Sequence, residues 1–197
     1  MQLGFKWCLL LSLLFCSYQE FKAQNTESYR HKIGLNYGYG TQNVWGKTIN
    51  SYYDINLFTL EYYYSIYRKR NWNLNLLAFP QYNITSYKFD ANQPQINQGY
   101  EFGINFGIQC SYKVFNGKLN PYLLISAGPH YISGAPQNQI PGFIFSDNAA
   151  LGSQVILSND LFLDLRVGVR HISNAELRFP NAGVNNLIFS IGIQRLL

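Results

Sequence analysis

Charged residues are scarce in this sequence. Asp, Glu, Lys and Arg make up 13% of its 197 residues, against ~25% in a typical soluble domain. The formal net charge is only +5, and the basic residues form no clustered run. Because nucleic-acid binding needs a concentrated basic surface, we expect no nucleic-acid partner.

Cysteine and histidine are also rare. Two of the three cysteines, Cys8 and Cys16, fall within residues 1–24, a segment that we expect to be cleaved from the mature protein. Only Cys110 then remains, so an intrachain disulfide is excluded. The three histidines are scattered, and no paired carboxylates occur at the spacing of metal ligands. The sequence therefore predicts no metal site and no cofactor.

The sequence has no apolar run of the ~20 residues that a membrane-spanning helix requires. Its apolar run near the N-terminus, which follows Lys6 and ends at Phe15, is shorter than that. This run and the small residue Ala23 predict a signal peptide at residues 1–24. We therefore expect an exported protein with one domain at residues 25–197. The bulky Phe15 disfavours the alternative of lipid attachment at the next residue.

Aromatic residues are abundant by contrast, with 16 Tyr and 14 Phe, a composition that suits the aromatic girdles of a membrane barrel. Alternation with a period of two recurs along the chain and indicates β-strands with one apolar face. The clearest example runs from Tyr100 to Tyr112. Similar segments begin near Ile33, Phe58, Trp72, Pro121, Gly142, Leu161 and Asn186, which gives eight strands.

The connections between these strands alternate between short and long. Residues 69–71, 116–118 and 158–160 are tight turns, whereas 41–55, 83–99, 134–141 and 174–184 are long. Outer-membrane barrels combine short periplasmic turns with long extracellular loops. The sequence therefore predicts an all-β, eight-stranded antiparallel up-and-down transmembrane β-barrel in the outer membrane, with both termini in the periplasm. The alternative is a soluble barrel of lipocalin type, whose apolar face would turn inward.

His171 and Ser173 continue the apolar face of the strand that begins at Leu161, while Asp164, Arg166 and Arg170 lie on the opposite face. Ten residues of tilted strand climb roughly 25 Å, so the pair is expected where outer-leaflet acyl chains meet their headgroups. A histidine beside a serine can take the hydroxyl proton and activate it as a nucleophile. Polar groups that face lipid are usually functional.

The segment from His171 to Asn174, followed by Asn181 and Gly183, resembles the signature of the lipid A 3-O-deacylases of Gram-negative outer membranes. The resemblance covers the region from about Gly168 to the C-terminus. It implies an esterase that removes the acyl chain at position 3 of lipid A, or of a related outer-leaflet lipid.

The resemblance also assigns roles to these residues. It makes His171 the general base, Ser173 the nucleophile and Asn174 an oxyanion donor, and it implies that Asn181 and Gly183 shape the loop before the last strand.

Asn185 departs from the family, which has at this position a glutamate that orients the histidine. Asn185 shares the outward parity of Leu187 and Phe189, so it can accept a hydrogen bond from the imidazole, but it cannot neutralise imidazolium. Glu176, in the loop before Asn185, is an alternative source of negative charge that could neutralise the imidazolium. The sequence supports two hypotheses: an esterase with the catalytic set His171, Ser173 and Asn185, or a structural or adhesive barrel with a degenerate site. It leaves open whether the barrel forms a homodimer.

Overall fold

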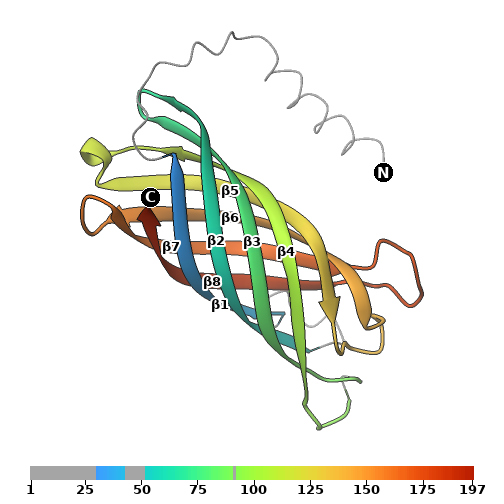
Figure 1. The fold of residues 1–197 in the computed structure, drawn as a ribbon. Helices are drawn as coiled ribbons and strands as arrows, with labels where there is room; N and C mark the ends of the chain where they lie inside the picture. The colour runs from blue at the N-terminus through green and yellow to red at the C-terminus, as the bar shows by residue number, and fades with distance from the viewer. Residues whose placement is uncertain (1–29, 43–51, 91) are drawn as a thin grey trace.

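The computed structural model describes residues 30–42, 52–90 and 92–197; the predicted signal peptide lies outside them. These residues form a closed barrel of eight strands in chain order (Figure 1). The strands are β1 (His31–Thr41), β2 (Tyr53–Lys69), β3 (Trp72–Tyr87), β4 (Asn97–Tyr112), β5 (Leu119–Ile132), β6 (Gly142–Ile156), β7 (Leu161–Ser173) and β8 (Val184–Leu196), with a short 3-10 turn, η2 (Phe115–Gly117), before β5.

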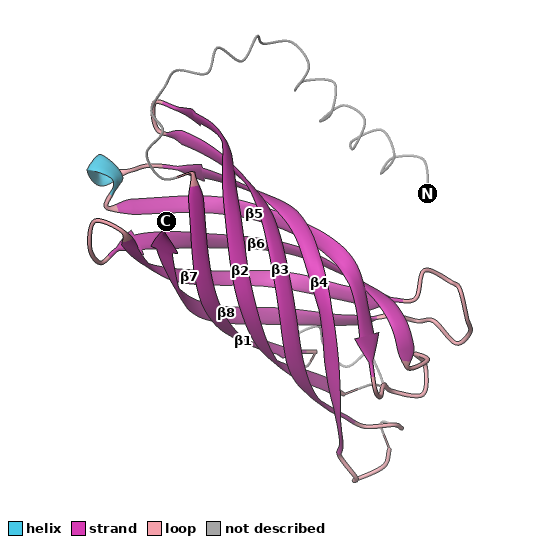
Figure 2. Ribbon diagram, viewed as in Figure 1, coloured by secondary structure: helices cyan, strands magenta, loops and turns pink. Residues whose placement is uncertain are grey.

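Each strand pairs antiparallel with its neighbour in the sequence, and β1 pairs with β8, with Lys32 opposite Leu196, to close the barrel. The predicted fold class is therefore confirmed. The tight turns, the described start of β1 and the C-terminus lie at one end of the barrel, and the longer loops lie at the other (Figure 2). We call these the turn end and the loop end.

Two strands extend further toward the loop end than the sequence indicated. We predicted a loop from residue 83 to 99, but β3 continues to Tyr87 and β4 already begins at Asn97. Asn83 resembles a turn residue in the sequence, yet its side chain is buried in the barrel and donates a hydrogen bond to Glu101 Oε1 at 3.1 Å. A polar lumen thus accepts residues that would end a strand elsewhere.

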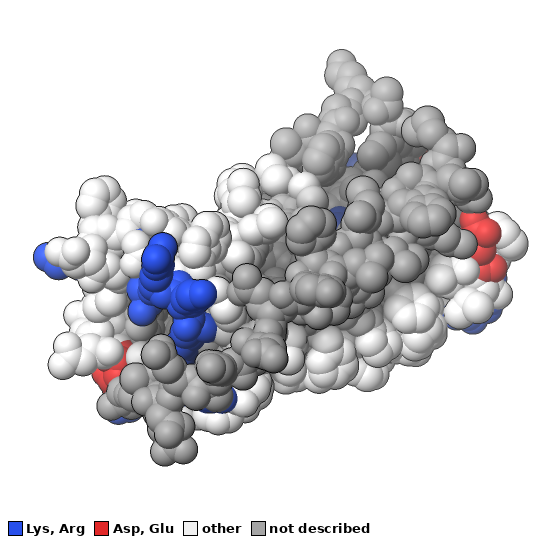
Figure 3. Space-filling view, turned by 90° about the horizontal axis from the view of Figure 1, so that it is seen from above, with Lys and Arg blue, Asp and Glu red and all other residues white. Residues whose placement is uncertain are grey.

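The outer wall of the barrel is apolar. Residues from the middle of the strands expose large hydrophobic side chains, among them Leu35, Phe58, Leu60, Phe102, Phe106, Leu123, Ile125, Leu151, Leu165, Phe189 and Ile191. Lys and Arg side chains gather instead at the turn end (Figure 3). A continuous apolar wall of this size is unfavourable in water and matches the lipid-facing band of a membrane barrel. None of the described residues forms a helix long and apolar enough to cross a membrane.

Aromatic pairs lie toward both ends of this wall. Tyr82 and Tyr100 stack near the loop end with ring centroids 6.4 Å apart, and Trp72 packs edge-on against Tyr112 near the turn end at 4.9 Å. Aromatic rings favour the membrane interfaces, where an apolar body and a polar tip are both satisfied.

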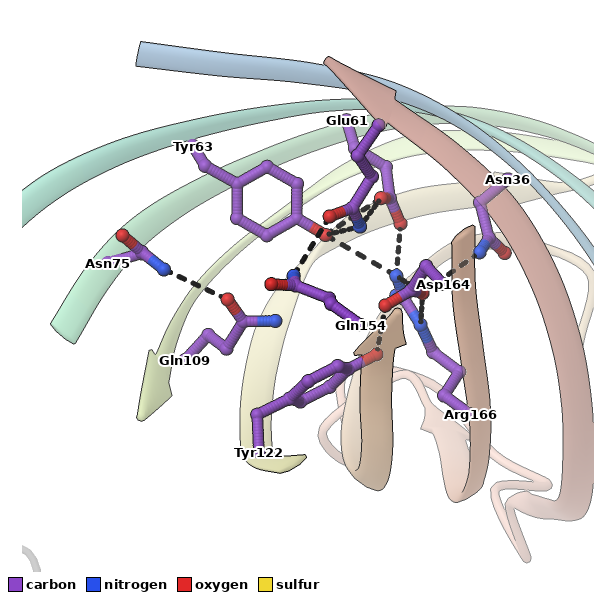
Figure 4. Close-up of polar contacts among 10 residues, drawn as sticks. Asn36, Glu61, Tyr63, Asn75, Gln109, Tyr122, Gln154, Asp164 and Arg166 are labelled. Carbon is purple, nitrogen blue, oxygen red and sulfur yellow. Dashed lines mark hydrogen bonds and ion pairs between the residues drawn. The ribbon is translucent and has the colours of Figure 1, made fainter. Parts of the chain in front are cut away.

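The interior is polar and carries paired charges (Figure 4). Arg166 contacts Glu61 Oε1 at 2.7 Å and donates from Nε to Asp164 Oδ2 at 2.8 Å. Tyr63 donates to Glu61, and Tyr122 donates to Asp164, each at 2.7 Å. Asp164 and Arg166, which the sequence places on the face opposite His171, therefore face the lumen and pair with each other.

A second ion cluster lies nearer the loop end of the lumen. Glu101 is fully buried and contacts both Arg170 and His130, with 2.6 Å between Glu101 Oε1 and His130 Nδ1. Arg170 is also bonded to Ser146, from Nε to Oγ at 3.1 Å. His130 is therefore an interior partner of Glu101.

The lumen becomes apolar at the loop end, where the sequence pattern did not predict a core. A cluster of buried side chains fills it: Tyr53, Ile55, Leu57, Ile132, Ala135, Ile144, Ile172 and Val184. At this level the outward positions of β2 are polar, with Asp54 and Asn56 accepting hydrogen bonds from Tyr39 and Tyr37. The polarity of the two faces thus reverses where the wall leaves the apolar band.

Substitution Glu101→Gln removes the only carboxylate bonded to Arg170 within the described residues, and it leaves that buried cation uncompensated. We expect a loss of ~3–5 kcal/mol in the free energy of unfolding, measured by urea titration of the folded barrel in lipid vesicles.

The matched control is Asp160→Asn, which breaks the exposed pair with Arg195 and should change the unfolding midpoint little, because water screens that pair. Equal effects of the two substitutions would contradict a structural role for the buried cluster.

Candidate functional site

His171 and Ser173 lie at the loop end of β7 and point away from the lumen. Both are half-buried, whereas Ile172 between them is fully buried in the apolar cluster of the lumen. The alternation of β7 thus places the imidazole and the hydroxyl on the outer wall, as their sequence parity predicted.

The imidazole of His171 is held by the last strand. His171 and Asn185 are directly opposite in the register of β7 and β8, and His171 Nδ1 lies 2.8 Å from Asn185 Oδ1. An amide oxygen can only accept a hydrogen bond, so Nδ1 donates. The lone pair of the neutral ring is then on Nε2, where it can take a proton.

Ser173 is the last residue of β7 and is opposite Phe145 of β6. Within the described residues its hydroxyl makes no side-chain hydrogen bond, so it is not committed to a structural partner. Residues two apart on one strand face are separated by roughly 6–7 Å along the backbone, which a histidine and a serine can bridge by rotation of their side chains. A base and a free hydroxyl therefore share one face.

Asn174 and Asn181 tie together the loop that follows β7. Asn174 is buried, and its side-chain amide donates to the carbonyl of Arg178 at 2.8 Å. The backbone N–H of Asn174 donates to Asn181 Oδ1 at 2.9 Å. Within the described residues the side-chain amide of Asn174 donates no other hydrogen bond, so its second N–H stays free while the first shapes the loop.

Gly183 packs against the imidazole. A Cβ at this position would lie 2.5 Å from His171 Cε1 and 3.1 Å from Nε2, and the backbone has a φ of +73°. Both facts favour glycine, since a side chain would collide with the ring and would strain the left-handed backbone. Gly183 thus lets the chain enter β8 directly beside His171.

Gln139 stabilises this arrangement from the neighbouring loop, and no sequence pattern indicated its role. Gln139 is buried, and its Oε1 accepts the backbone N–H of Gly183 at 3.1 Å. Two backbone hydrogen bonds also join the loops, from Ile140 to the carbonyl of Pro180 and from Ala182 to that of Asn138. The loop that carries Gly183 is therefore fixed by the loop between β5 and β6.

Glu176, the alternative acidic partner, lies in an exposed part of the same loop. Within the described residues no hydrogen bond or ion pair joins it to His171. The described ranges also contain no group of three or more His, Cys, Asp or Glu side chains that could hold a metal ion.

A groove of about 1070 Å³ runs along the outer wall from His171 and Asn185 toward β4. Six apolar side chains line it, namely Phe106, Ile108, Ile125, Ala127, Ala149 and Val169. The small residues at 127 and 149 keep the groove open beside the histidine. Its shape and apolar lining suit an alkyl chain, whose burial there is favourable.

Comparison with known proteins gives a family match. The model of the lipid A 3-O-deacylase (PagL) family matches residues 31–194. No curated protein matches the sequence.

Solved structures share the fold at low sequence identity. The outer-membrane enzyme PagL has a TM-score of 0.61 and 14% identity, covering 83% of this chain and 99% of that chain. Neisserial surface protein A has a TM-score of 0.51 and 11% identity, and the attachment invasion locus protein Ail of Yersinia pestis has 0.51 and 14%. Each covers 86% of this chain and 99% of its own.

Substitution Gly183→Ala should displace the imidazole from Asn185, because the new methyl group would overlap His171 Cε1. We expect loss of the hydrogen-bonded Nδ1–H signal of His171 in ¹⁵N NMR spectra of the barrel in nanodiscs.

Gly117→Ala is a matched control, since Gly117 also has a positive φ, of +84°, but only Lys113 Cδ lies within 4 Å of its Cβ position, at 3.9 Å. An unchanged His171 signal in Gly183→Ala would show that the glycine does not set the ring position.

Proposed function

This chain belongs to the lipid A 3-O-deacylase (PagL) family, and from that premise we propose that it is an outer-membrane serine esterase that hydrolyses the ester-linked acyl chain at position 3 of lipid A. Its place in the outer membrane follows from the family and from the barrel fold. The observation that carries the proposed activity is the pairing of His171 Nδ1 with Asn185 on the same outer face as the free hydroxyl of Ser173.

In the proposed reaction, Ser173 Oγ attacks the ester carbonyl carbon while its proton passes to His171 Nε2. The tetrahedral intermediate collapses, the bond to the sugar oxygen breaks, and His171 returns the proton to that oxygen. Water then attacks the acyl-enzyme carbonyl while His171 takes its proton; the bond to Ser173 Oγ breaks, His171 returns the proton to Oγ, and the fatty acid is released. The products are a carboxylic acid and lipid A with a free hydroxyl at position 3.

The negative charge on the tetrahedral oxygen needs a donor near Ser173. We assign this role to Asn174, which directly follows the nucleophile in the sequence and whose second amide N–H is free. Asn181 and Gly183 keep the loop in place, the first through the backbone of Asn174 and the second by its close packing on His171. A preorganised donor of this kind stabilises charge that develops only in the transition state.

The position of these residues suits a lipid substrate. His171 and Ser173 lie at the loop end of the wall, the level at which we expect acyl chains to meet headgroups, and the apolar groove extends from His171 along the wall. An acyl chain in the groove would present its ester carbonyl at the histidine without leaving the membrane. Holding the ester beside the base in this way contributes to catalysis through proximity.

Substitutions Ser173→Ala and His171→Ala should each abolish deacylation, because the reaction loses its nucleophile or its base. We expect a loss of at least about 10³-fold. The measurement is mass spectrometry of lipid A from a Gram-negative host that expresses each variant. Wild type should remove one hydroxyacyl mass, and both variants should leave lipid A intact.

Ser153→Ala serves as the control, since Ser153 belongs to β6 but is opposite Leu165, far along the strand toward the turn end. Heat-modifiable mobility on gels should show that all three variants fold. Deacylation by folded Ser173→Ala at the wild-type rate would remove the basis for the proposed activity.

Asn185 favours a second candidate, a structural or adhesive barrel whose site is degenerate, because an amide cannot neutralise imidazolium. This candidate predicts that folded wild type leaves lipid A unchanged and that Asn185→Glu gains deacylation. The esterase proposal predicts measurable deacylation by wild type in the same host. The mass spectrum of lipid A therefore separates the two.

A further inference from the structure

A carboxylate lies beside His171 on the strand opposite to Asn185. Asp147 of β6 is the register partner of His171, just as Asn185 is its partner on β8. Asp147 is exposed on the outer wall and lines the same groove as His171 and Asn185. The three side chains thus form a row across β6, β7 and β8, with the imidazole in the middle.

Directly opposite residues of an antiparallel pair have Cβ atoms about 4.5–5.5 Å apart. The described structure has no hydrogen bond or ion pair between Asp147 and His171, whose Nδ1 is already bonded to Asn185. Asp147 is therefore placed to act on the ring through its charge, while Asn185 sets the orientation of the ring.

The other acidic residues of the strands have evident partners. Glu61, Glu101 and Asp164 are buried in the lumen, and each contacts an arginine. On the outer wall, Asp54 accepts hydrogen bonds from Tyr39 and Tyr52. Asp147 has no such bond within the described residues, and it stands on an apolar wall. A carboxylate in that setting is unfavourable for the fold and therefore indicates a function.

We propose that Asp147 is a positioning residue that supplies, from β6, the negative charge that Asn185 cannot supply from β8. The inference rests on the proposed esterase function. When the proton of Ser173 passes to His171 Nε2, the ring becomes a cation, and the adjacent carboxylate stabilises it. Asp147 acts through its charge alone and takes no proton; the proton leaves with the sugar oxygen. The carboxylate and the ring are directly opposite in the register of β6 and β7, so the charge acts over a short distance.

The other described charged groups near the imidazole of His171 are not placed to stabilise its cationic form. Arg170 faces the lumen, where Glu101 compensates its charge. In the loop after β7, Arg178 donates to the carbonyl of Pro141, and Glu176 is exposed without a bond to the ring. Among the described residues, Asp147 is thus the acidic side chain in direct register with His171.

The experiment is steady-state kinetics of the purified barrel on lipid A with an intact 3-hydroxyacyl ester, in mixed micelles. Asp147→Asn should lower kcat at least about tenfold while KM stays within about twofold, because the charge acts in the transition state. Asp147→Glu should retain most of the wild-type kcat. In the double variant Asp147→Asn, Asn185→Glu, the charge returns from β8, and kcat should recover about tenfold relative to Asp147→Asn.

Asp54→Asn is the matched control, since it removes the other outward carboxylate of the strands and should leave kcat unchanged. An unchanged kcat in Asp147→Asn would overturn the inference, as would a defect in KM alone, which would indicate contact with substrate. The inference would also be contradicted if the folded double variant Asp147→Asn, Asn185→Glu had no higher kcat than Asp147→Asn. The parallel Ser173→Ala variant tests the esterase proposal separately: its full activity would remove that proposal, whatever Asp147 does.

Discussion

Closure of the sheet is the constraint on which the rest of this molecule depends. In lipid no water is available to the backbone, so every N–H and C=O needs a partner within the protein. Pairing of β1 with β8 provides those partners for the edge strands. The closed ladder then divides each strand into lipid-facing and lumen-facing positions. The ion pairs of Arg166 and Arg170 can be buried only because they take the lumen positions.

The same ladder assembles the site. Cross-strand register brings Asp147, His171 and Asn185 into one row, although they come from three strands and none is adjacent in the sequence. The buried apolar cluster at the loop end packs on the lumen side of these strands. The hydrogen bond from Gly183 to Gln139 joins the loop after β7 to the loop after β5 and holds Gly183 against the imidazole of His171. The chemistry that we propose for the outer wall thus depends on packing in the interior and on the two joined loops.

Local periodicity was sufficient to predict the strands, their faces and the outward pair of His171 and Ser173. It also predicted a hydrogen bond between Asn185 and the imidazole, which the structure contains. The orientation inferred from the loop lengths, with both termini in the periplasm, stays a prediction. The ends of β3 and β4 were missed because Asn83 is satisfied by Glu101 across the lumen. Gln139 and Asp147 were missed for a related reason: their importance arises from loop contacts and strand register, and neither leaves a periodic signal in the sequence.

The central claim is that the outer wall activates Ser173 as a nucleophile. Treatment of the folded barrel in micelles with an alkyl fluorophosphonate, followed by peptide mass spectrometry, tests this claim without assuming a particular lipid. The account predicts a covalent adduct on Ser173 in wild type and none when His171 is replaced by alanine. A folded wild-type barrel that gives no adduct on Ser173, or an adduct that forms equally without His171, would contradict it.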